Sequence, residues 1–98
     1  MNTESKKKKK KKKQKLPKWF NGDIYPSGET VRNPYSGETA ELTAEETSMY
    51  DLIKGLEWMI EFSGGFLNNK THSLQKDLRK GLNWFRINNP EAYMTLLD

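Results

Sequence analysis

A run of eight consecutive lysines near the N-terminus is the strongest constraint on what this chain can fold into. The run occupies residues 6–13, and two further lysines follow at positions 15 and 18. Adjacent like charges repel one another and the lysine ammonium group is strongly hydrated, so a packed core cannot bury such a segment. We therefore expect residues 1–18 to form a disordered basic tail outside the folded core.

The charge of the chain is divided between this tail and the remainder. Residues 1–18 hold ten lysines and one acidic residue, a formal charge of +9, whereas residues 19–98 hold seven basic and twelve acidic residues, a formal charge of −5. A polyanion such as nucleic acid, an anionic lipid surface or an acidic protein is expected to bind the tail, without sequence preference and with a steep dependence on salt. The predicted polyanion-binding residues are Lys6, Lys7, Lys8, Lys9, Lys10, Lys11, Lys12, Lys13, Lys15 and Lys18.

Patterns typical of catalysis and of metal binding are missing from the sequence. The chain has no cysteine, which excludes disulfides and cysteine-ligated zinc. His72 is the single histidine and has no acidic partner at ligand spacing, so we expect it to face solvent in the first turn of a helix. Glu57 and Glu61 lie one helical turn apart but lack the Glu-x-x-His companion of a di-iron site, so a solvated helix face is expected. We predict a non-enzymatic protein without a cofactor.

Residues 19–41 are rich in turn-forming residues. The tetrapeptide Ser-Gly-Glu-Thr occurs at residues 27–30 and again at residues 36–39, each time shortly after a proline. Proline followed by small polar residues and glycine is typical of turns. Two turns nine residues apart, with Thr-Val-Arg between them, predict a short hairpin or an extended arm.

Residues 42–98 carry the signals of a small helical domain. Thr43 and Glu46 have the spacing of a capping box, and Gly64 with Gly65 is expected to end the helix that begins there. Apolar residues recur every three or four positions along this helix, namely Met49, Leu52, Ile53, Leu56, Met59 and Ile60. We therefore predict one amphipathic helix between these two signals.

Two more helices are expected toward the C-terminus. The second runs from about residue 71 or 73 to about 88, and Gly81 on it would permit close approach of the first helix. Its apolar stripe is Leu74, Leu78, Leu82 and Phe85. Asn89 followed by Pro90 predicts the start of a short third helix. The predicted fold is mainly α, a unit of two to three helices with a turn-rich arm and a basic tail.

Two interpretations of the aromatic residues near the tail remain open. In the first, Trp19 and Tyr25 stack on single-stranded bases, as aromatic residues beside basic ones can do. The basic residues Lys76, Arg79 and Lys80 of the second helix would then join the tail in one groove. In the second, Trp19 and Phe20 pin the arm to the helical body, as expected of large aromatics in a small domain.

The surface chemistry of the predicted helices adds two expectations. The first helix is acidic on its outside and the second is basic, so their charges are expected to complement each other across an antiparallel pair. Tyr50, Trp58 and Trp84 are not needed to fill so small a core. We assign these three residues to a contact surface for a protein partner or a second copy of the chain.

Several short motifs from residue 33 onward resemble a known group of sequences. They are Asn33-Pro34-Tyr35-Ser36-Gly37-Glu38, Glu41-Leu42-Thr43, Tyr50-Asp51-Leu52-Ile53-Lys54-Gly55, Trp84-Phe85-Arg86, Asn89-Pro90-Glu91-Ala92-Tyr93-Met94 and Leu96-Leu97-Asp98. These motifs resemble short uncharacterised proteins encoded by marine bacteriophages, including cyanophages. The resemblance implies a phage origin and a small accessory protein, and it carries no functional residues over. The lysine run is not part of it.

Three classes of function follow as hypotheses. The first is a phage accessory or virion-associated protein whose body binds a protein partner or itself while its tail attracts polyanions. The second is a nucleic-acid-binding protein that uses the tail together with the aromatics. The third is a host-directed inhibitor with an acidic helix face. No apolar run approaches the ~20 residues of a membrane span, and no apolar segment follows the lysines as in a signal peptide. We therefore expect a non-secreted protein in the host cytoplasm or the virion.

Overall fold

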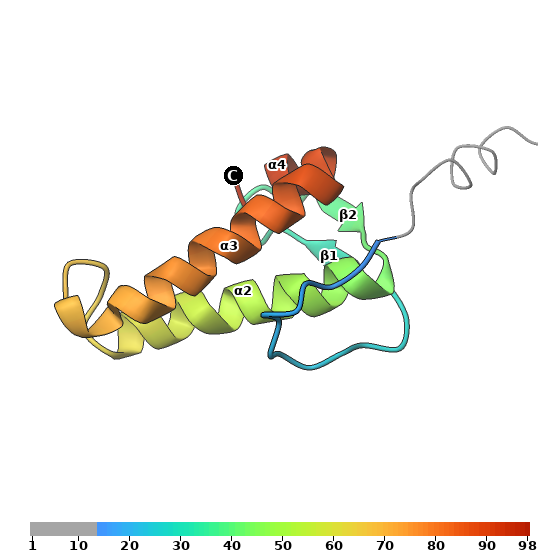
Figure 1. The fold of residues 1–98 in the computed structure, drawn as a ribbon. Coiled ribbons are helices and arrows are strands. Elements are labelled where there is room, and N and C mark those ends of the chain that lie inside the picture. The colour runs from blue at the N-terminus through green and yellow to red at the C-terminus, as the bar shows by residue number, and fades with distance from the viewer. Residues whose placement is uncertain (1–13) are drawn as a thin grey trace, which may run out of the picture.

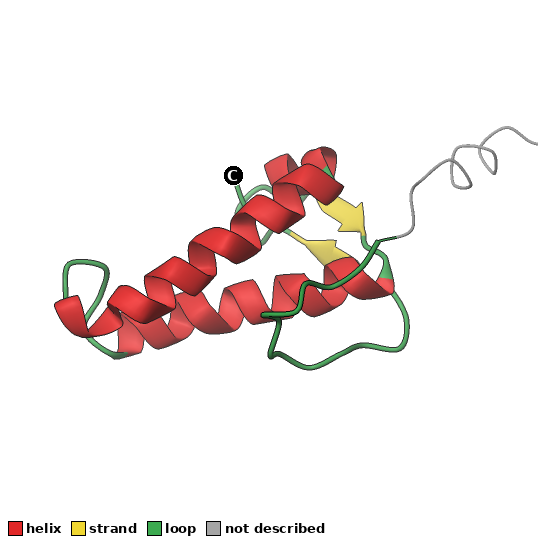
Figure 2. Cartoon of the chain, viewed as in Figure 1, coloured by secondary structure: helices red, strands yellow, loops and turns green. Residues whose placement is uncertain are grey.

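A computed structural model describes residues 14–98 of the chain, and the lysine run at residues 6–13 lies outside them (Figure 1). Two long helices, α2 (Ala44–Phe62) and α3 (His72–Asn88), lie side by side as an antiparallel pair. A short helix α4 (Pro90–Leu96) and two strands, β1 (Thr30–Arg32) and β2 (Thr39–Glu41), gather at one end of this pair (Figure 2). The predictions of a mainly helical fold and of a short hairpin are confirmed.

Helix α2 begins and ends where its local signals place it. The Thr43 hydroxyl accepts from the Glu46 backbone N–H at 3.1 Å, and the Glu46 carboxylate accepts from the Thr43 N–H at 3.0 Å, which completes the capping box. The chain leaves the helix through Gly64 and Gly65, whose φ angles of +117° and +90° lie in the left-handed region. The residues that α2 buries in the core are Met49, Ile53, Leu56 and Ile60.

Helix α3 packs against α2 through the predicted stripe. Leu78 and Phe85 are buried, whereas Leu74 and Leu82 are partly buried at the margin of the same core. A Cβ atom built on Gly81 would lie 3.0 Å from the Ile53 side chain, so the glycine lets the two backbones approach. The short 3-10 helix η1 (Asn69–Thr71) precedes α3.

The buried carboxylate of Glu46 joins three distant segments of the chain. It accepts hydrogen bonds from Gln14 Nε2 at 2.6 Å and from Asn89 Nδ2 at 3.0 Å, in addition to the Thr43 N–H. Asn89 is also the N-cap of α4, because its side chain accepts from the Ala92 N–H at 3.1 Å. The N-terminal segment and the starts of α2 and α4 are therefore held together around one side chain.

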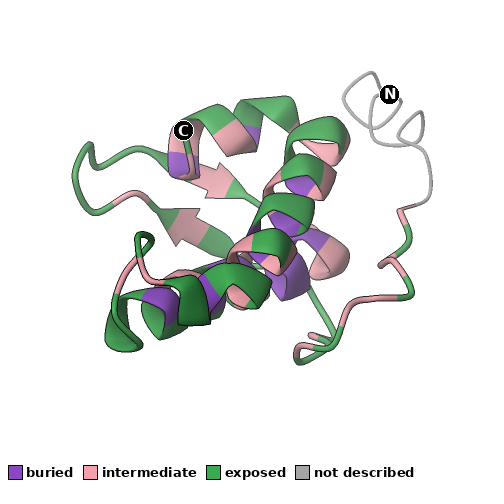
Figure 3. Cartoon of the chain, turned by 60° about the vertical axis from the view of Figure 1, so that its left-hand side comes forward, coloured by how far each residue is buried: buried purple, intermediate pink, exposed green. Residues whose placement is uncertain are grey.

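The hairpin packs on α4 and contributes to the same core. Strands β1 and β2 pair antiparallel with Val31 opposite Ala40, and both side chains pack against the core cluster. The Asn33 side chain donates to the carbonyl of Thr95 in α4 at 2.8 Å. The arm and the helices thus share one core, although the sequence led us to describe them as separate segments (Figure 3).

Residues 14–18 lie against the body, whereas the sequence placed them in the tail. Gln14 accepts from the Thr43 hydroxyl at 2.7 Å, and Leu16 packs against the core. The carbonyl of Lys15 accepts from Trp84 Nε1 at 3.1 Å. The segment packs through its backbone and its apolar side chain, while Lys15 and Lys18 keep their ammonium groups exposed. Within residues 14–98, no helix is long and apolar enough to cross a membrane.

Candidate nucleic-acid interface

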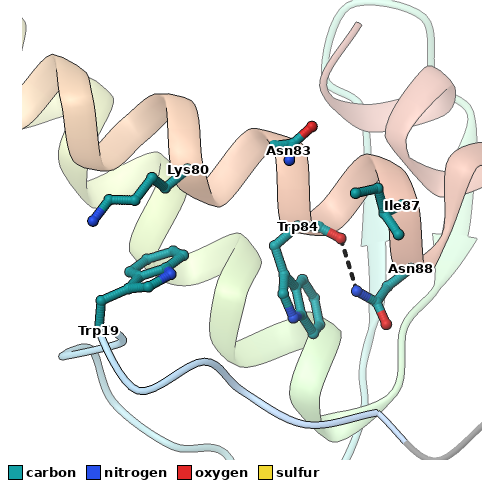
Figure 4. A pocket seen from close by; sticks show the side chains of 6 residues that line it. All are labelled: Trp19, Lys80, Asn83, Trp84, Ile87 and Asn88. Atoms are coloured by element: carbon teal, nitrogen blue, oxygen red, sulfur yellow. Dashed lines mark hydrogen bonds between the residues drawn. The ribbon is translucent and has the colours of Figure 1, made fainter.

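An open pocket of about 270 Å³ lies between the N-terminal segment and the second half of α3 (Figure 4). Trp19 forms one wall, and the other lining residues belong to α3. These are Lys80, Asn83, Trp84, Ile87 and Asn88. Their spacing of three and four residues places them on one face of the helix. The pocket therefore depends on the way in which residues 14–20 run along α3.

Two indole rings border this pocket, and each is held by a defined contact. The ammonium group of Lys80 lies 5.1 Å from the centre of the Trp19 ring, which is cation–π geometry. The Trp84 ring is fixed by its hydrogen bond to Lys15 and by an edge contact with Phe85, at 6.4 Å between ring centres. Both rings are partly buried, so part of each remains open to a ligand.

The charges of the two long helices are opposite in sign. Helix α3 holds four basic residues and one acid, a formal +3, whereas α2 holds five acids and one lysine, a formal −4. The predicted charge pairing between the two helices is wrong for the described part of the chain: its two ion pairs, Lys54–Glu57 and Asp77–Lys80, each lie within one helix. Apolar side chains fill the contact between the helices, so the basic groups of α3 remain in solvent.

The basic groups near the pocket continue into the tail. Lys15 and Lys18 are exposed on the segment that forms one wall, and Lys76 is exposed one turn before Lys80. Arg79 lies beside this line, at a second depression that it shares with His72, Gln75 and Lys76. A chain of phosphates could therefore follow positive charge from Lys15 and Lys18 to α3, with the indole rings beside its path.

The structure brings Trp19 and Lys80 together but places Tyr25 elsewhere. The backbone N–H of Tyr25 donates to the Ser48 hydroxyl of α2 at 2.9 Å. The carboxylate of Asp51 is the main cause that raises the pKa of the Tyr25 phenol above its usual 10.0, with Glu29 and Asp23 adding to it. This acidic surrounding is unfavourable for a phosphate backbone.

Trp84 and Asn88 are pocket residues that our sequence reasoning missed. The signal lay in their spacing, because Lys80, Trp84 and Asn88 are four residues apart on one face of α3. Trp84 was assigned to a protein contact surface together with Tyr50 and Trp58. Tyr50 is partly buried near Phe85, at 6.5 Å between ring centres, and of the three only Trp58 is strongly exposed, at 65%.

The remaining candidate side chains do not form a second site. His72 is exposed at the first position of α3, and Glu61 is exposed near the end of α2. Glu57 forms an ion pair with Lys54, with 3.2 Å between Lys54 Nζ and Glu57 Oε1. In the part of the chain that the structure describes, no three His, Asp or Glu side chains are grouped so as to hold a metal ion.

Comparison of the chain with protein-family models, with curated proteins and with solved structures gives no match. The resemblance of residues 33–98 to short phage proteins stays an expectation. Function is therefore inferred from the residues of the chain itself.

Proposed function

We propose that this protein is a non-enzymatic nucleic-acid-binding protein with a preference for single strands. The observation that carries the proposal is the pocket that places Trp19, Trp84 and Lys80 beside the segment leading to the lysine run. The lysines attract the phosphate backbone, and the indole rings offer faces on which bases stack. A phage accessory or virion-associated role, which the resemblance implies, is compatible with this activity.

The lysines and the indole rings contribute to the free energy of binding in different ways. Lysine is a compact, strongly hydrated charge, so it supplies affinity for phosphates without distinguishing bases. Stacking of a base on an aromatic ring contributes about 1–3 kcal/mol and also tolerates any sequence. Bases in a duplex already stack on one another, so only a single strand gains this second term. Lys80 lies over Trp19, and its flexible stem allows it to move from the ring to a neighbouring phosphate.

The acidic helix sets the orientation of the bound strand. Helix α2 carries a formal −4 and the outer face of α3 is basic, so a polyanion is attracted to one side of the molecule and repelled from the other. The affinity of the body is therefore confined to α3 and the N-terminal segment. The tail alone would bind single and double strands with little distinction.

The proposal is tested by titrating the full chain against labelled single-stranded and duplex DNA and RNA over a range of salt concentrations. Trp19→Ala is expected to weaken single-strand binding by about tenfold, the equivalent of one lost stack, and to leave duplex binding and the salt slope unchanged. Lys80→Gln should reduce the salt slope more than Lys70→Gln, which removes an exposed lysine outside the pocket.

A second pair of variants leaves Trp19 in place, because Trp19 also packs against the core. Ile87 lines the pocket and Met94 lies on α4, and both side chains are 65% exposed. Ile87→Glu places a negative charge in the path of the strand and should weaken binding several-fold more than Met94→Glu, which makes the same charge change elsewhere. Equal affinity for single and double strands, together with equal effects of these two variants, would show that the tail binds alone. The body would then act on a protein partner.

A further inference from the structure

The face of α2 that points away from the core carries an exposed aromatic pair. Trp58 and Phe62 lie one turn apart and are 65% and 77% exposed. Their rings stack on each other with centres 5.1 Å apart and an angle of 8° between the planes. The buried residues of α2 occupy the opposite face of the helix. The pair therefore fills no internal space and presents two large apolar rings to water.

Three more exposed apolar residues belong to the end of α2 and to the connector that follows it, at the same end of the molecule (Figure 1). Met59 on α2 is 41% exposed, and Phe66 and Leu67, which follow the helix, are 50% and 98% exposed. A large aromatic side chain offers about 150–250 Å² of surface, so the five exposed residues present on the order of 600 Å² together. This equals the largest patches found on monomers, and two such patches together reach roughly the 1,200 Å² of a small specific interface.

Two further features make this face complementary to itself. Gly55 is exposed one turn before Trp58, and a Cβ atom built on it would meet nothing within 4 Å, so open space without a side chain lies over the backbone (the hollow of this face). Lys54 and Glu61 lie seven residues apart along one edge of the face. Lys54 makes an exposed pair with Glu57, which contributes little, and its ammonium lies 5.8 Å from the centre of the Tyr50 ring. Glu61 makes no ion pair with another described residue.

We infer that the outer face of α2 binds a second copy of this chain, with the two helices antiparallel and the two-fold axis near Trp58. A two-fold arrangement brings the same edge of both helices together, so positions three or four residues before Trp58 face positions three or four residues after it. Gly55 then receives the ring of Phe62 of the second copy. Lys54 lies opposite Glu61 of the second copy, and each contact occurs twice.

The arm provides an additional contact in this arrangement. Tyr25 lies beside Asp51 of α2, and its neighbour Ile24 is 74% exposed. Asp51 is seven residues before Trp58, so this part of the arm falls near the Gly64–Gly65 turn of the second copy. The candidate nucleic-acid pocket is formed with α3 and stays free. A dimer would carry two tails and two pockets, which raises the avidity for a long strand.

The oligomeric state of the full chain, measured by sedimentation velocity from low micromolar to near-millimolar concentration, is the first test. Salt high enough to screen the tails should be present. We expect a concentration-dependent monomer–dimer equilibrium.

Trp58→Ser and Gly55→Gln should each raise the dissociation constant of the dimer by about tenfold or more, since buried tryptophans dominate interfaces and glutamine fills the hollow. Glutamine is also the better helix former, so this second variant keeps its fold. Met94→Ser removes an equally exposed apolar side chain from α4 and should leave the equilibrium unchanged.

Charge reversal distinguishes a second copy from every other occupant of the face. Lys54→Glu and Glu61→Lys should each weaken the dimer several-fold, and the double variant should return the dissociation constant toward that of the unmodified chain. A foreign partner would not produce such rescue, because it does not carry both changes. A chain that stays monomeric throughout, a dimer insensitive to the Trp58 and Gly55 variants, or an absence of rescue would each overturn the inference. None of these outcomes depends on nucleic-acid binding.

Discussion

The two ends of the α2–α3 helix pair are held by different kinds of contact. At the end where α2 begins, the N-terminal segment and the starts of α2 and α4 meet around the buried Glu46, whose carboxylate accepts from three donors, and the hairpin packs on α4. At the opposite end, the chain turns through a short connector and leaves Trp58, Phe62 and Leu67 in solvent. The first end joins segments that are distant in the chain, whereas the hydrogen bonds of the second end are local, such as that from the Thr71 hydroxyl to the Gly65 carbonyl at 2.9 Å. The second end can therefore present apolar side chains that folding does not require.

The largest expected effect comes from replacing phenylalanine with alanine at one end of the pair, with the same replacement at the other end as the control. Phe85 is fully buried at the first end of the pair, and Phe62 is 77% exposed at the other. Phe85→Ala should lower the free energy of unfolding by about 3–5 kcal/mol, because the lost transfer energy and the cavity add. This is a large share of the roughly 5–15 kcal/mol of a whole domain.

Phe62→Ala is the matched control and should change the free energy of unfolding by less than about 0.5 kcal/mol. Urea denaturation followed by circular dichroism at low micromolar concentration measures both variants. Similar losses for the two substitutions would mean that the single chain buries Phe62 beyond its stacking on Trp58, and the contrast between the ends would disappear.

The helices of this protein are predictable because their signals are local. The capping box at Thr43, the cap at Asn89 and the glycine pair at 64 and 65 each rest on residues at most four positions apart. The close approach at Gly81 also followed from sequence, because a glycine within an apolar helical stripe has few other uses. Local chemistry thus determined where α2 starts and stops and where α4 starts, whereas α3 begins without a side-chain cap.

The candidate pocket could not be predicted in full, because its contacts are distant in the chain. The hydrogen bond from Trp84 to Lys15 joins residues 69 positions apart, and that from Asn89 to Glu46 joins residues 43 apart. No spacing rule connects such pairs. The lysine content of the N-terminus also concealed the apolar contact of Leu16, because charge density alone assigned residues 1–18 to the tail. Trp19 beside Lys80 was foreseen in one of the two interpretations, and the packing of Trp19 and Phe20 against the core was foreseen in the other.

Removal of the Glu46 carboxylate tests whether the first end depends on the three hydrogen bonds that this carboxylate accepts. Glu46→Ala leaves the side chains of Gln14 and Asn89 and the Thr43 N–H without their acceptor in a buried setting. We expect the free energy of unfolding to fall by about 2–4 kcal/mol, since each unsatisfied buried donor costs about 1–3 kcal/mol and some regain water. Glu61→Ala, an exposed glutamate on the same helix, should change it by less than about 0.5 kcal/mol. Equal midpoints of urea unfolding for the two variants would contradict a stabilising role of the Glu46 hydrogen bonds.

The smallest effect contrasts the two glycines within α2 and α3. Alanine at Gly55 places its methyl group in open solvent, so helix propensity should raise the free energy of unfolding by about 0.5–1 kcal/mol. Alanine at Gly81 gains the same propensity, but its methyl group would lie 3.0 Å from Ile53 and has to displace a packed side chain. Gly81→Ala should therefore be less stable than Gly55→Ala by about 1–3 kcal/mol, the usual cost of overpacking. Parallel urea titrations at low micromolar concentration measure this difference, and two equally stabilised variants would show that α2 and α3 have room to separate where Ile53 meets Gly81.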